Sequence, residues 1–246
     1  MRLFFHIGRY FILMAKVFSR PEKSKIYYKR IITEIKNLGL NSIGIVVIIS
    51  VFMGAVITMQ TTYNIENPLL PVYLVGVAAR DSLLLEFSST MVALILAGKV
   101  GSSISSEIGT MRVTEQIDAL EIMGVNSASY LILPKITALV LFNPILTLLS
   151  MFVGILGGWL VCVFTGVTSP PDYIYGIQYA FIPYYVTYSL IKSLFFGFII
   201  TSVSAYYGYY TKGSSLEVGM SSTKAVVYSS VVILMFNLIL TKLLLS

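Results

Sequence analysis

Five stretches of this 246-residue chain are long and apolar enough to cross a lipid bilayer. A helical span needs about 20 mostly apolar residues. Hydrophobic residues make up 57% of the chain and charged residues only 11%, whereas soluble domains carry about 25% charged residues. The sequence therefore predicts an all-α integral membrane domain, residues 40–246, behind a basic segment, residues 1–39. The predicted spans are roughly residues 43–63, 83–104, 131–165, 183–207 and 225–245.

Lysine and arginine are unevenly distributed along the chain. Residues 1–39 hold nine of the 17, whereas Arg80 and Lys242 are the basic residues on the opposite side of the predicted spans. Because basic segments stay in the cytoplasm, we expect a cytoplasmic N-terminus and an outer C-terminus. A net charge of +6 placed in this way gives no indication of nucleic-acid binding.

The first 20 residues have the pattern of an amphipathic helix. At about 100° per residue the cations share one narrow face, and apolar side chains share the opposite face. The cations are Arg2, Arg9, Lys16 and Arg20, and the apolar residues are Leu3, Phe4, Ile7, Phe11, Met14 and Phe18. This pattern predicts a helix lying in the cytoplasmic membrane interface.

The residue types that enzymes and metal sites need are scarce. With one histidine, His6, and one cysteine, Cys162, the chain offers neither a Ser/His/Asp triad nor a zinc site. The stretch AGKVGSS, residues 97–103, lacks the glycine that a phosphate-binding loop needs five residues before Gly98. We therefore expect no catalytic residue, metal or cofactor in this chain.

A polar helix is predicted in the gap between the second and third spans, over residues 107–124. Gly109-Thr110 suits its start and Gly124 its end. The narrow apolar stripe is Val113, Ile117 and Leu120, and the acidic stripe beside it is Glu107, Thr114, Asp118 and Glu121. An acidic ridge beside an apolar stripe suits a cytoplasmic protein that docks there. The alternative is a solvated connecting loop.

Two ionisable residues fall within predicted spans. Lys192 lies about ten residues into the fourth span, and Glu86 stands at the outer start of the second. A charge in hydrocarbon costs several kcal/mol and usually faces a partner or a cavity. The structural alternatives are an internal ion pair for Lys192 and snorkelling for Glu86. The functional alternative is a headgroup site or a substrate pocket that opens outward.

Pairs of small residues recur at helix-packing spacing within the spans. They are Gly154 with Gly158, Ala97 with Gly101, and Ser193 with Gly197. Such pairs let helix backbones approach closely in lipid. We expect most of them to pack within the chain, although some could serve a dimer interface.

Two stretches carry a resemblance to a known family. AGKVGSSISSEIGTMRVTEQIDALEIMGVNSASYLILPK, residues 97–135, resembles the signature region of MlaE-family permeases, and residues 208–241 resemble the family's last cytoplasmic loop and final helix. The similarity runs from about residue 40 onward. These permeases are the membrane subunits of ABC transporters that move phospholipids or related lipids in bacteria and plastids.

The resemblance implies an assembly. Family members have an N-terminal interfacial helix and five spans, and two copies form a homodimer. Each copy docks a separate cytoplasmic ATPase, which binds ATP and Mg²⁺, and an MCE-domain protein on the outer side supplies a lipid conduit. A small regulatory subunit is left open. The residues assigned to ATPase coupling are Glu107, Arg112, Glu115, Asp118 and Glu121.

The chain departs from the family pattern near Glu86. Where the family commonly has Arg-Glu-Leu-Gly-Pro, this chain has Leu85-Glu86-Phe87-Ser88-Ser89, and a common acidic position reads Asn237. The resemblance places Leu85, Glu86 and Lys192 near a lipid cavity between the two copies, which predicts lipid binding there. Arg80 and Asp81, just upstream, are candidates to replace the missing arginine.

The function indicated is the permease subunit of an ABC transporter in a bacterial inner membrane, with its C-terminus in the periplasm. It would move phospholipids between the inner and outer membranes and so maintain outer-membrane lipid asymmetry. A secondary carrier for a small amphipathic solute would need an internal repeat, which the sequence lacks. A lipid-modifying membrane enzyme would need clustered His, Asp or Glu. A scaffold subunit that transports nothing stays open.

Overall fold

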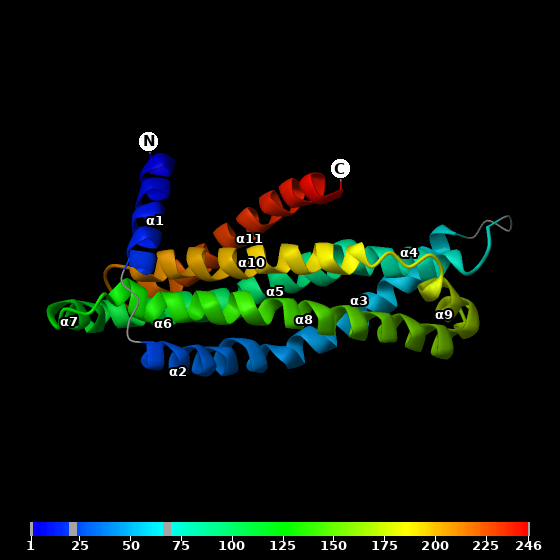
Figure 1. Ribbon diagram of the computed structural model, residues 1–246, viewed down its shortest axis with the longest axis horizontal. Helices are drawn as coiled ribbons and strands as arrows, with labels where there is room; N and C mark the ends of the chain where they lie inside the picture. Colours follow the sequence, from blue (N-terminus) through cyan, green and yellow to red (C-terminus); the bar gives the residue numbers. More distant parts are fainter. Residues whose placement is uncertain (1, 20–23, 66–69, 246) are drawn as a thin grey trace. The chain divides into compact units, whose positions relative to one another are not determined.

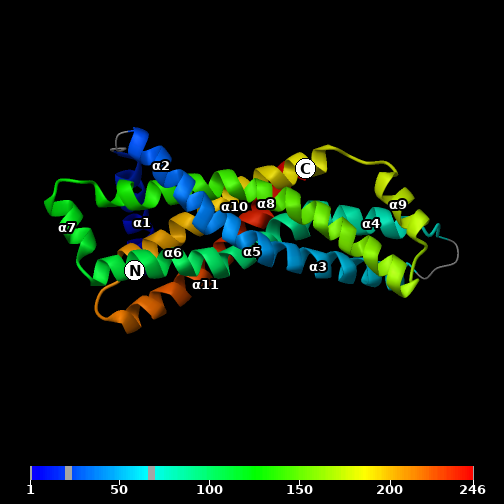
Figure 2. The same cartoon turned by 90° about the horizontal axis from the view of Figure 1, so that it is seen from below.

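The computed structural model describes residues 2–19, 24–65 and 70–245, and within these ranges the chain is helical with no strand. Figure 1 shows the helices in chain order, and Figure 2 shows them from a second direction. The α-helices are α1 (Arg2–Ser19), α2 (Ser24–Glu34), α3 (Ile43–Asn64), α4 (Leu74–Ser82), α5 (Val92–Leu96), α6 (Ser102–Val113), α7 (Gln116–Ile122), α8 (Ser127–Thr165), α9 (Pro170–Gln178), α10 (Tyr184–Tyr209) and α11 (Ser215–Leu245).

Five helical stretches in the described residues are long and apolar enough to span a membrane, which confirms the predicted fold class. They are Tyr27–Asn64, Leu74–Val113, Ser127–Thr165, Tyr184–Tyr209 and Ser215–Leu245. All five are longer than the sequence estimate, because a helix satisfies its own backbone hydrogen bonds and does not end where its side chains become polar. The second stretch, for example, begins nine residues before Leu83 and runs on to Val113.

Four short segments depart from α-helical geometry. The π-helical segments are η1 (Ile35–Gly39), η3 (Leu83–Met91) and η4 (Ala97–Gly101), and η2 (Leu40–Ser42) is a 3₁₀ turn. Two of the π-helical segments, η3 and η4, lie in the second span. Single π-helical turns are rare and often occur at functional sites.

The chain forms two compact units. The first contains residues 1–42, 93–143 and 194–243, and the second contains residues 43–92, 144–193 and 244–246.

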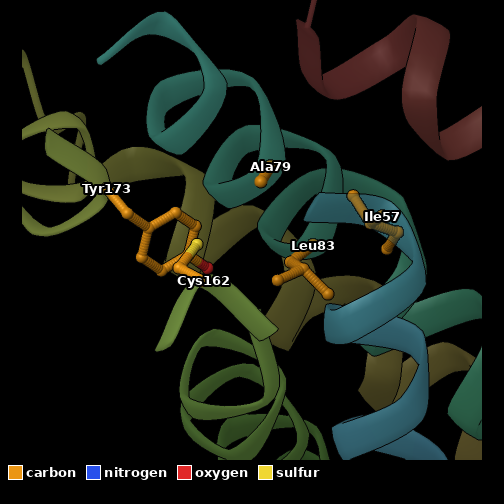
Figure 3. Close-up of a cluster of buried hydrophobic side chains, with 5 residues drawn as sticks. All are labelled: Ile57, Ala79, Leu83, Cys162 and Tyr173. Atoms are coloured by element: carbon orange, nitrogen blue, oxygen red, sulfur yellow. The ribbon is translucent and has the colours of Figure 1, made fainter. Parts of the chain in front are cut away.

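In the second unit, α3, α8, α4 and α9 pack through glycines. A Cβ added to Gly54 would lie 1.8 Å from the Gly154 carbonyl oxygen, and one added to Gly76 would lie 3.1 Å from the Gly176 Cα. A small apolar core fills the space beside these contacts, formed by Ile57, Ala79, Leu83, Cys162 and Tyr173 (Figure 3). The single cysteine is therefore a buried packing residue, as expected.

The first unit uses small residues in the same way. Gly101 on η4 faces Ser204 on α10, and Gly197 on α10 lies against the Leu139 backbone of α8. The glycines of all three predicted pairs therefore have close neighbours within the chain, as expected for helix packing in lipid.

The amphipathic helix α1 is present, and it packs on α10. Leu13, Met14 and Val17 are buried, while Phe4 and Phe11 are exposed. Met14 was predicted to share one apolar face with these phenylalanines, but it is buried and they are exposed. The buried residues form a stripe along one edge of the predicted apolar face.

Polar contacts hold α1 in place. His6 Nδ1 lies 2.7 Å from the Tyr206 hydroxyl, and Tyr10 donates to Ser202 Oγ at 2.8 Å. The Arg9 guanidinium lies 3.7 Å from the Tyr210 ring centroid, so this cation faces an aromatic ring of its own chain. Arg20 lies outside the described residues, as do the side chains of Arg2 and Leu3.

Candidate functional site

The polar segment between the second and third spans forms a corner of two helices. The helix of the second span continues to Val113, the backbone turns at Thr114 and Glu115, and α7 follows. Glu115 has φ 60°, in the left-handed region, and Gly124 has φ 77° just after α7. The helix α7 thus ends at Ile122, two residues before Gly124.

The predicted single helix over residues 107–124, with its start at Gly109-Thr110, is wrong, because α6 ends at Val113 and α7 begins at Gln116. Gly109 lies inside α6, where a Cβ would meet Val218 at 3.2 Å and Thr211 at 3.3 Å. Its small size therefore serves packing against α11 and the preceding loop, and it does not start a helix. The actual break falls at a non-glycine residue, Glu115.

An ion pair spans this corner. Arg112 Nη1 on α6 lies 2.7 Å from Asp118 Oδ1 on α7, and both side chains are partly exposed. The Arg112 guanidinium is also 5.9 Å from the Tyr209 ring centroid. This pair links the end of α6 to α7.

The end of α7 is bound to two other helices through one carboxylate. Ser127 Oγ at the start of α8 and the Tyr209 hydroxyl on α10 each lie 2.9 Å from Glu121 Oε1. The hydrogen bond from Ser127 is the main reason that the pKa of Glu121 is lowered; burial opposes it, and Tyr209, Arg112 and Lys16 add to the lowering. Glu121 is therefore a charged anchor for α7.

Glu107 belongs to a separate ion network in the same unit. Lys135 on α8 is only 2% exposed, and its Nζ lies 2.8 Å from Glu34 on α2 and 2.8 Å from Glu107 on α6. The same face of α2 makes two further contacts with α8: Tyr27 with Thr137 at 2.5 Å, and Arg30 with the Tyr130 carbonyl at 2.8 Å. Lys135 thus joins three helices.

Four of the five residues assigned to coupling therefore have partners inside the chain, and Glu115 is exposed at the break. The outward surface of α7 is mostly formed by other residues. Ile122 is 87% exposed and Met123 68%, while Ile117 is buried. Glu121 is exposed as well, although its carboxylate is bonded to Ser127 and Tyr209. We call the other exposed residues at this helix, Glu115, Gln116, Ala119, Ile122 and Met123, the α7 surface.

Sequence reasoning missed the partners Glu34, Lys135, Ser127 and Tyr209. Hydroxyl groups give no charge signal, and Glu34 is 101 residues from Lys135. Ile122 and Met123 carried a signal that was overlooked: two large apolar residues directly before the helix-ending Gly124.

The second candidate site lies in the second unit and contains Leu85, Glu86 and Lys192. Lys192 is fully buried, and its Nζ lies 3.0 Å from Glu86 Oε1 and 2.9 Å from the Tyr188 hydroxyl. It also approaches the Leu85 carbonyl at 3.4 Å. The structure thus brings the three predicted residues together, and the internal ion pair expected as one alternative for Lys192 is present.

The two members of this ion pair differ in accessibility. The Glu86 side chain is 40% exposed, whereas Lys192 is 0% exposed. Thr90, one turn further along, donates to Glu86 Oε2 at 3.1 Å. Only the acidic member of the pair can be reached from outside the protein.

Arg80 does not replace the missing arginine. Its side chain is 2% exposed and pairs with Asp81 at 2.8 Å. Its Nη1 donates to the carbonyls of Ile177 and Tyr179 at the end of α9. Arg80 therefore caps the C-terminus of α9 and is turned toward that helix.

Comparison with known proteins matches this chain to permeases, which agrees with its five apolar helical stretches. The family model described as Permease MlaE matches residues 31–243. A probable ABC transporter permease protein of Rickettsia bellii is 34% identical over 98% of this chain and 93% of its own length. The intermembrane phospholipid transport system permease protein MlaE of Haemophilus influenzae is 30% identical over 94% of this chain and 88% of its own length.

A plant relative is similar over most of the same region. The chloroplastic protein TRIGALACTOSYLDIACYLGLYCEROL 1 of Arabidopsis thaliana is 31% identical over 94% of this chain and 65% of its own length. The family match, the extent of these similarities and the five apolar helical stretches point the same way. This chain belongs to the MlaE permease family, and it is a multi-pass membrane transport subunit rather than an enzyme.

Proposed function

We propose that this chain is the permease subunit of an ABC transporter that moves phospholipids between the inner and outer membranes of a bacterium. Two copies form a homodimer in the inner membrane, with a cytoplasmic ATPase on one side and a periplasmic MCE-domain protein on the other. A small regulatory subunit is compatible with this assembly. The Haemophilus influenzae relative, named as a permease of an intermembrane phospholipid transport system, supports the substrate class.

The observation that carries the proposal is the α6–α7 corner. It presents a small exposed surface, and the Arg112–Asp118 pair and the Glu121 anchor fix that surface to α6, α8 and α10. A surface held by three helices can transmit the motion of a docked partner to them. The chain's positive N-terminal segment, by the positive-inside rule, supports a cytoplasmic location for the corner.

The contacts refine the roles of the five coupling residues. We assign direct contact with the ATPase to the α7 surface, with Glu115 as its charged member. Arg112, Asp118, Glu121 and Glu107 keep the corner rigid, because their charges already have partners in the chain. Coupling then depends on both groups of residues, for different reasons.

We assign lipid contact to Glu86, the exposed member of the ion pair with Lys192. Glu86 is accessible and Lys192 is not, so a headgroup in this region would meet the Glu86 carboxylate and the neighbouring Leu85 side chain. Lys192 would hold that carboxylate in one orientation, because a charge in hydrocarbon stays close to its partner. The acyl chains would lie against apolar span residues.

The first test is affinity purification of the tagged chain from native membranes in mild detergent, with co-purifying proteins identified by mass spectrometry. We expect an ATPase with a phosphate-binding loop and an MCE-domain protein. A chain that purifies without a nucleotide-binding protein, even after crosslinking, would contradict the proposal and favour a secondary carrier.

A charge reversal on the α7 surface tests the docking site. Glu115→Arg should reduce recovery of the ATPase severalfold and leave recovery of the MCE-domain protein unchanged. Asp172→Arg, on the exposed first turn of α9, is the matched control and should leave ATPase recovery unchanged. Equal ATPase recovery with Glu115→Arg and with the unmodified chain would show that this surface is not the docking site.

A further inference from the structure

The π-helical segment η3 differs from an ordinary helical turn in how its carbonyls are used. Ser189 Oγ on α10 donates to the Leu84 carbonyl, and Lys192 Nζ lies 3.4 Å from the Leu85 carbonyl. Ser89 Oγ lies 3.4 Å from the Glu86 carbonyl. Three successive carbonyls of one span therefore receive side-chain donors.

These donors matter because η3 lies in a membrane span. A π-helical turn replaces the i→i+4 hydrogen bonds of an α-helix by i→i+5 bonds, which disturbs the ladder where the two geometries meet. In hydrocarbon no water can satisfy a carbonyl that is left over, so neighbouring side chains must do so. Ser189 and Lys192 are both fully buried and lie three residues apart, on one face of α10.

We propose that Ser189 and Lys192 are positioning residues that hold the second span in its π-helical register over Leu83–Met91. The hydroxyl of Ser189 donates to the Leu84 carbonyl, and the ammonium of Lys192 donates to the Leu85 carbonyl. Lys192 then has two roles: it supports the backbone of the second span, and it forms the ion pair with Glu86. This role is separate from lipid binding.

The register decides which side chains of the segment face outward. In the π-helical form, Ser88 and Ser89 are buried, whereas Glu86 and Met91 are partly exposed. One residue of helical register corresponds to a rotation of about 100°. If η3 relaxed to an α-helix, its later residues would rotate relative to its first turn by up to about that angle, and the Ser89 position, near the end of η3, would leave the interior.

Cysteine accessibility measures this rotation directly. Ser89→Cys is nearly isosteric, and Cys162→Ala removes the native thiol from the background. The purified protein would be treated with a small methanethiosulfonate reagent, and the labelling rate of the introduced thiol followed by mass spectrometry. Ser150→Cys, a buried position on α8 in the same unit, is the matched control for global loosening.

The expected rates follow from the number of donors removed. A hydrogen bond of ordinary strength changes a local equilibrium roughly fivefold, so Ser189→Ala should raise labelling of the thiol at position 89 by about that factor. The double variant Ser189→Ala/Lys192→Met should raise it by more than about tenfold, because the weaker 3.4 Å contact is lost as well. The thiol at position 150 should stay protected in both variants.

Glu86→Gln separates backbone support from ion pairing. It removes the charge of the pair but leaves the Lys192 ammonium beside the Leu85 carbonyl, so the thiol at position 89 should stay protected. If Glu86→Gln exposes this thiol as much as the double variant does, the ion pair holds the register and the proposal is wrong. If no variant changes labelling at position 89, the segment keeps its register unaided, which also overturns it.

If the double variant is unstable, the single variant Ser189→Ala still tests the proposal. A rise in labelling at both position 89 and position 150 would report general unfolding, and Ser189→Ala alone then decides the question, since it removes a single hydroxyl. The readout involves no lipid and no ATPase. A negative result would therefore leave the proposed transport function standing.

Discussion

Replacing Gly54 by alanine is expected to force α3 away from α8. A Cβ at this position would lie 1.8 Å from the Gly154 carbonyl oxygen and 2.6 Å from its carbonyl carbon. Ordinary contact begins at 3.4 Å, so the helices would have to separate by about 1.6 Å, the difference between 3.4 Å and 1.8 Å. Both atoms are backbone, so no side-chain rotation relieves the clash.

The cost can be estimated from what the separation breaks. Over-packing of this kind costs about 3 kcal/mol at the upper end of its usual range. One turn earlier on both helices, Ser50 donates to Ser150 at 2.8 Å, and loss of that bond adds about 1 kcal/mol. The better helix propensity of alanine offsets about 1 kcal/mol. The net loss of about 3 kcal/mol corresponds to a Tm about 6–12 °C lower for a chain of this length.

Thermal unfolding of the purified protein in detergent, followed by the fraction that still elutes as a single species, measures this shift. Gly44→Ala in the same helix is the control, because nothing lies within 4 Å of a Cβ added there. Its Tm should be unchanged or slightly higher. A Gly54→Ala variant as stable as Gly44→Ala would refute the close packing of α3 on α8.

Three further predictions concern polar anchors. Lys135→Met should lower Tm more than Glu107→Gln does. The first change leaves two facing carboxylates without their buried cation, whereas the second leaves Lys135 paired with Glu34. Equal Tm values for the two variants would contradict this. The pKa of Glu121 is lowered on folding, so its contribution to stability is complete above its ordinary pKa of 4.5 and is lost as the pH falls below that value. Tm measured from pH 7 to pH 3 should therefore fall more steeply for the unmodified chain than for Glu121→Gln, and parallel curves would refute the assignment. Arg80→Met should make α9 sensitive to limited proteolysis. Arg80→Lys should restore protection only in part, since one ammonium cannot reproduce both the Nη1 bonds to two carbonyls and the Nε bond to Asp81. Protection of Arg80→Met equal to that of the unmodified chain would exclude the cap.

Much of the fold could be predicted because the bilayer imposes one strong constraint. Five apolar stretches of sufficient length leave few alternatives to five helices, and small residues at four-residue spacing mark where helices touch. Residue 154 illustrates this: its glycine was expected to pack within the chain, and it lies against α3. The helix bounds were less predictable, because polarity changes before helical hydrogen bonding stops.

The polar contacts were predictable only where a charge stood in hydrocarbon. Lys192 needed a partner there, and Glu86 was the acidic residue expected near the same region. Glu107 gave no such signal, because its partner Lys135 looked like an ordinary cytoplasmic cation. The break between α6 and α7 at Glu115 was not predictable either, because a glutamate rarely adopts a positive φ. Gly109 and Gly124, on either side, are the residue type that more often ends a helix.

The contacts of α1 have a consequence for the order in which the protein is completed. His6 and Tyr206 are 200 residues apart, and Tyr10 and Ser202 are 192 apart. At about 5–20 residues per second, a ribosome needs roughly 10–40 seconds to add that much chain. For that time α1 lacks the α10 partners of His6 and Tyr10, although Leu13 and Val17 of the same helix are buried in the complete protein. The helix α1 is thus made well before the helix that holds it, and until then the membrane surface or the insertion machinery must shelter it.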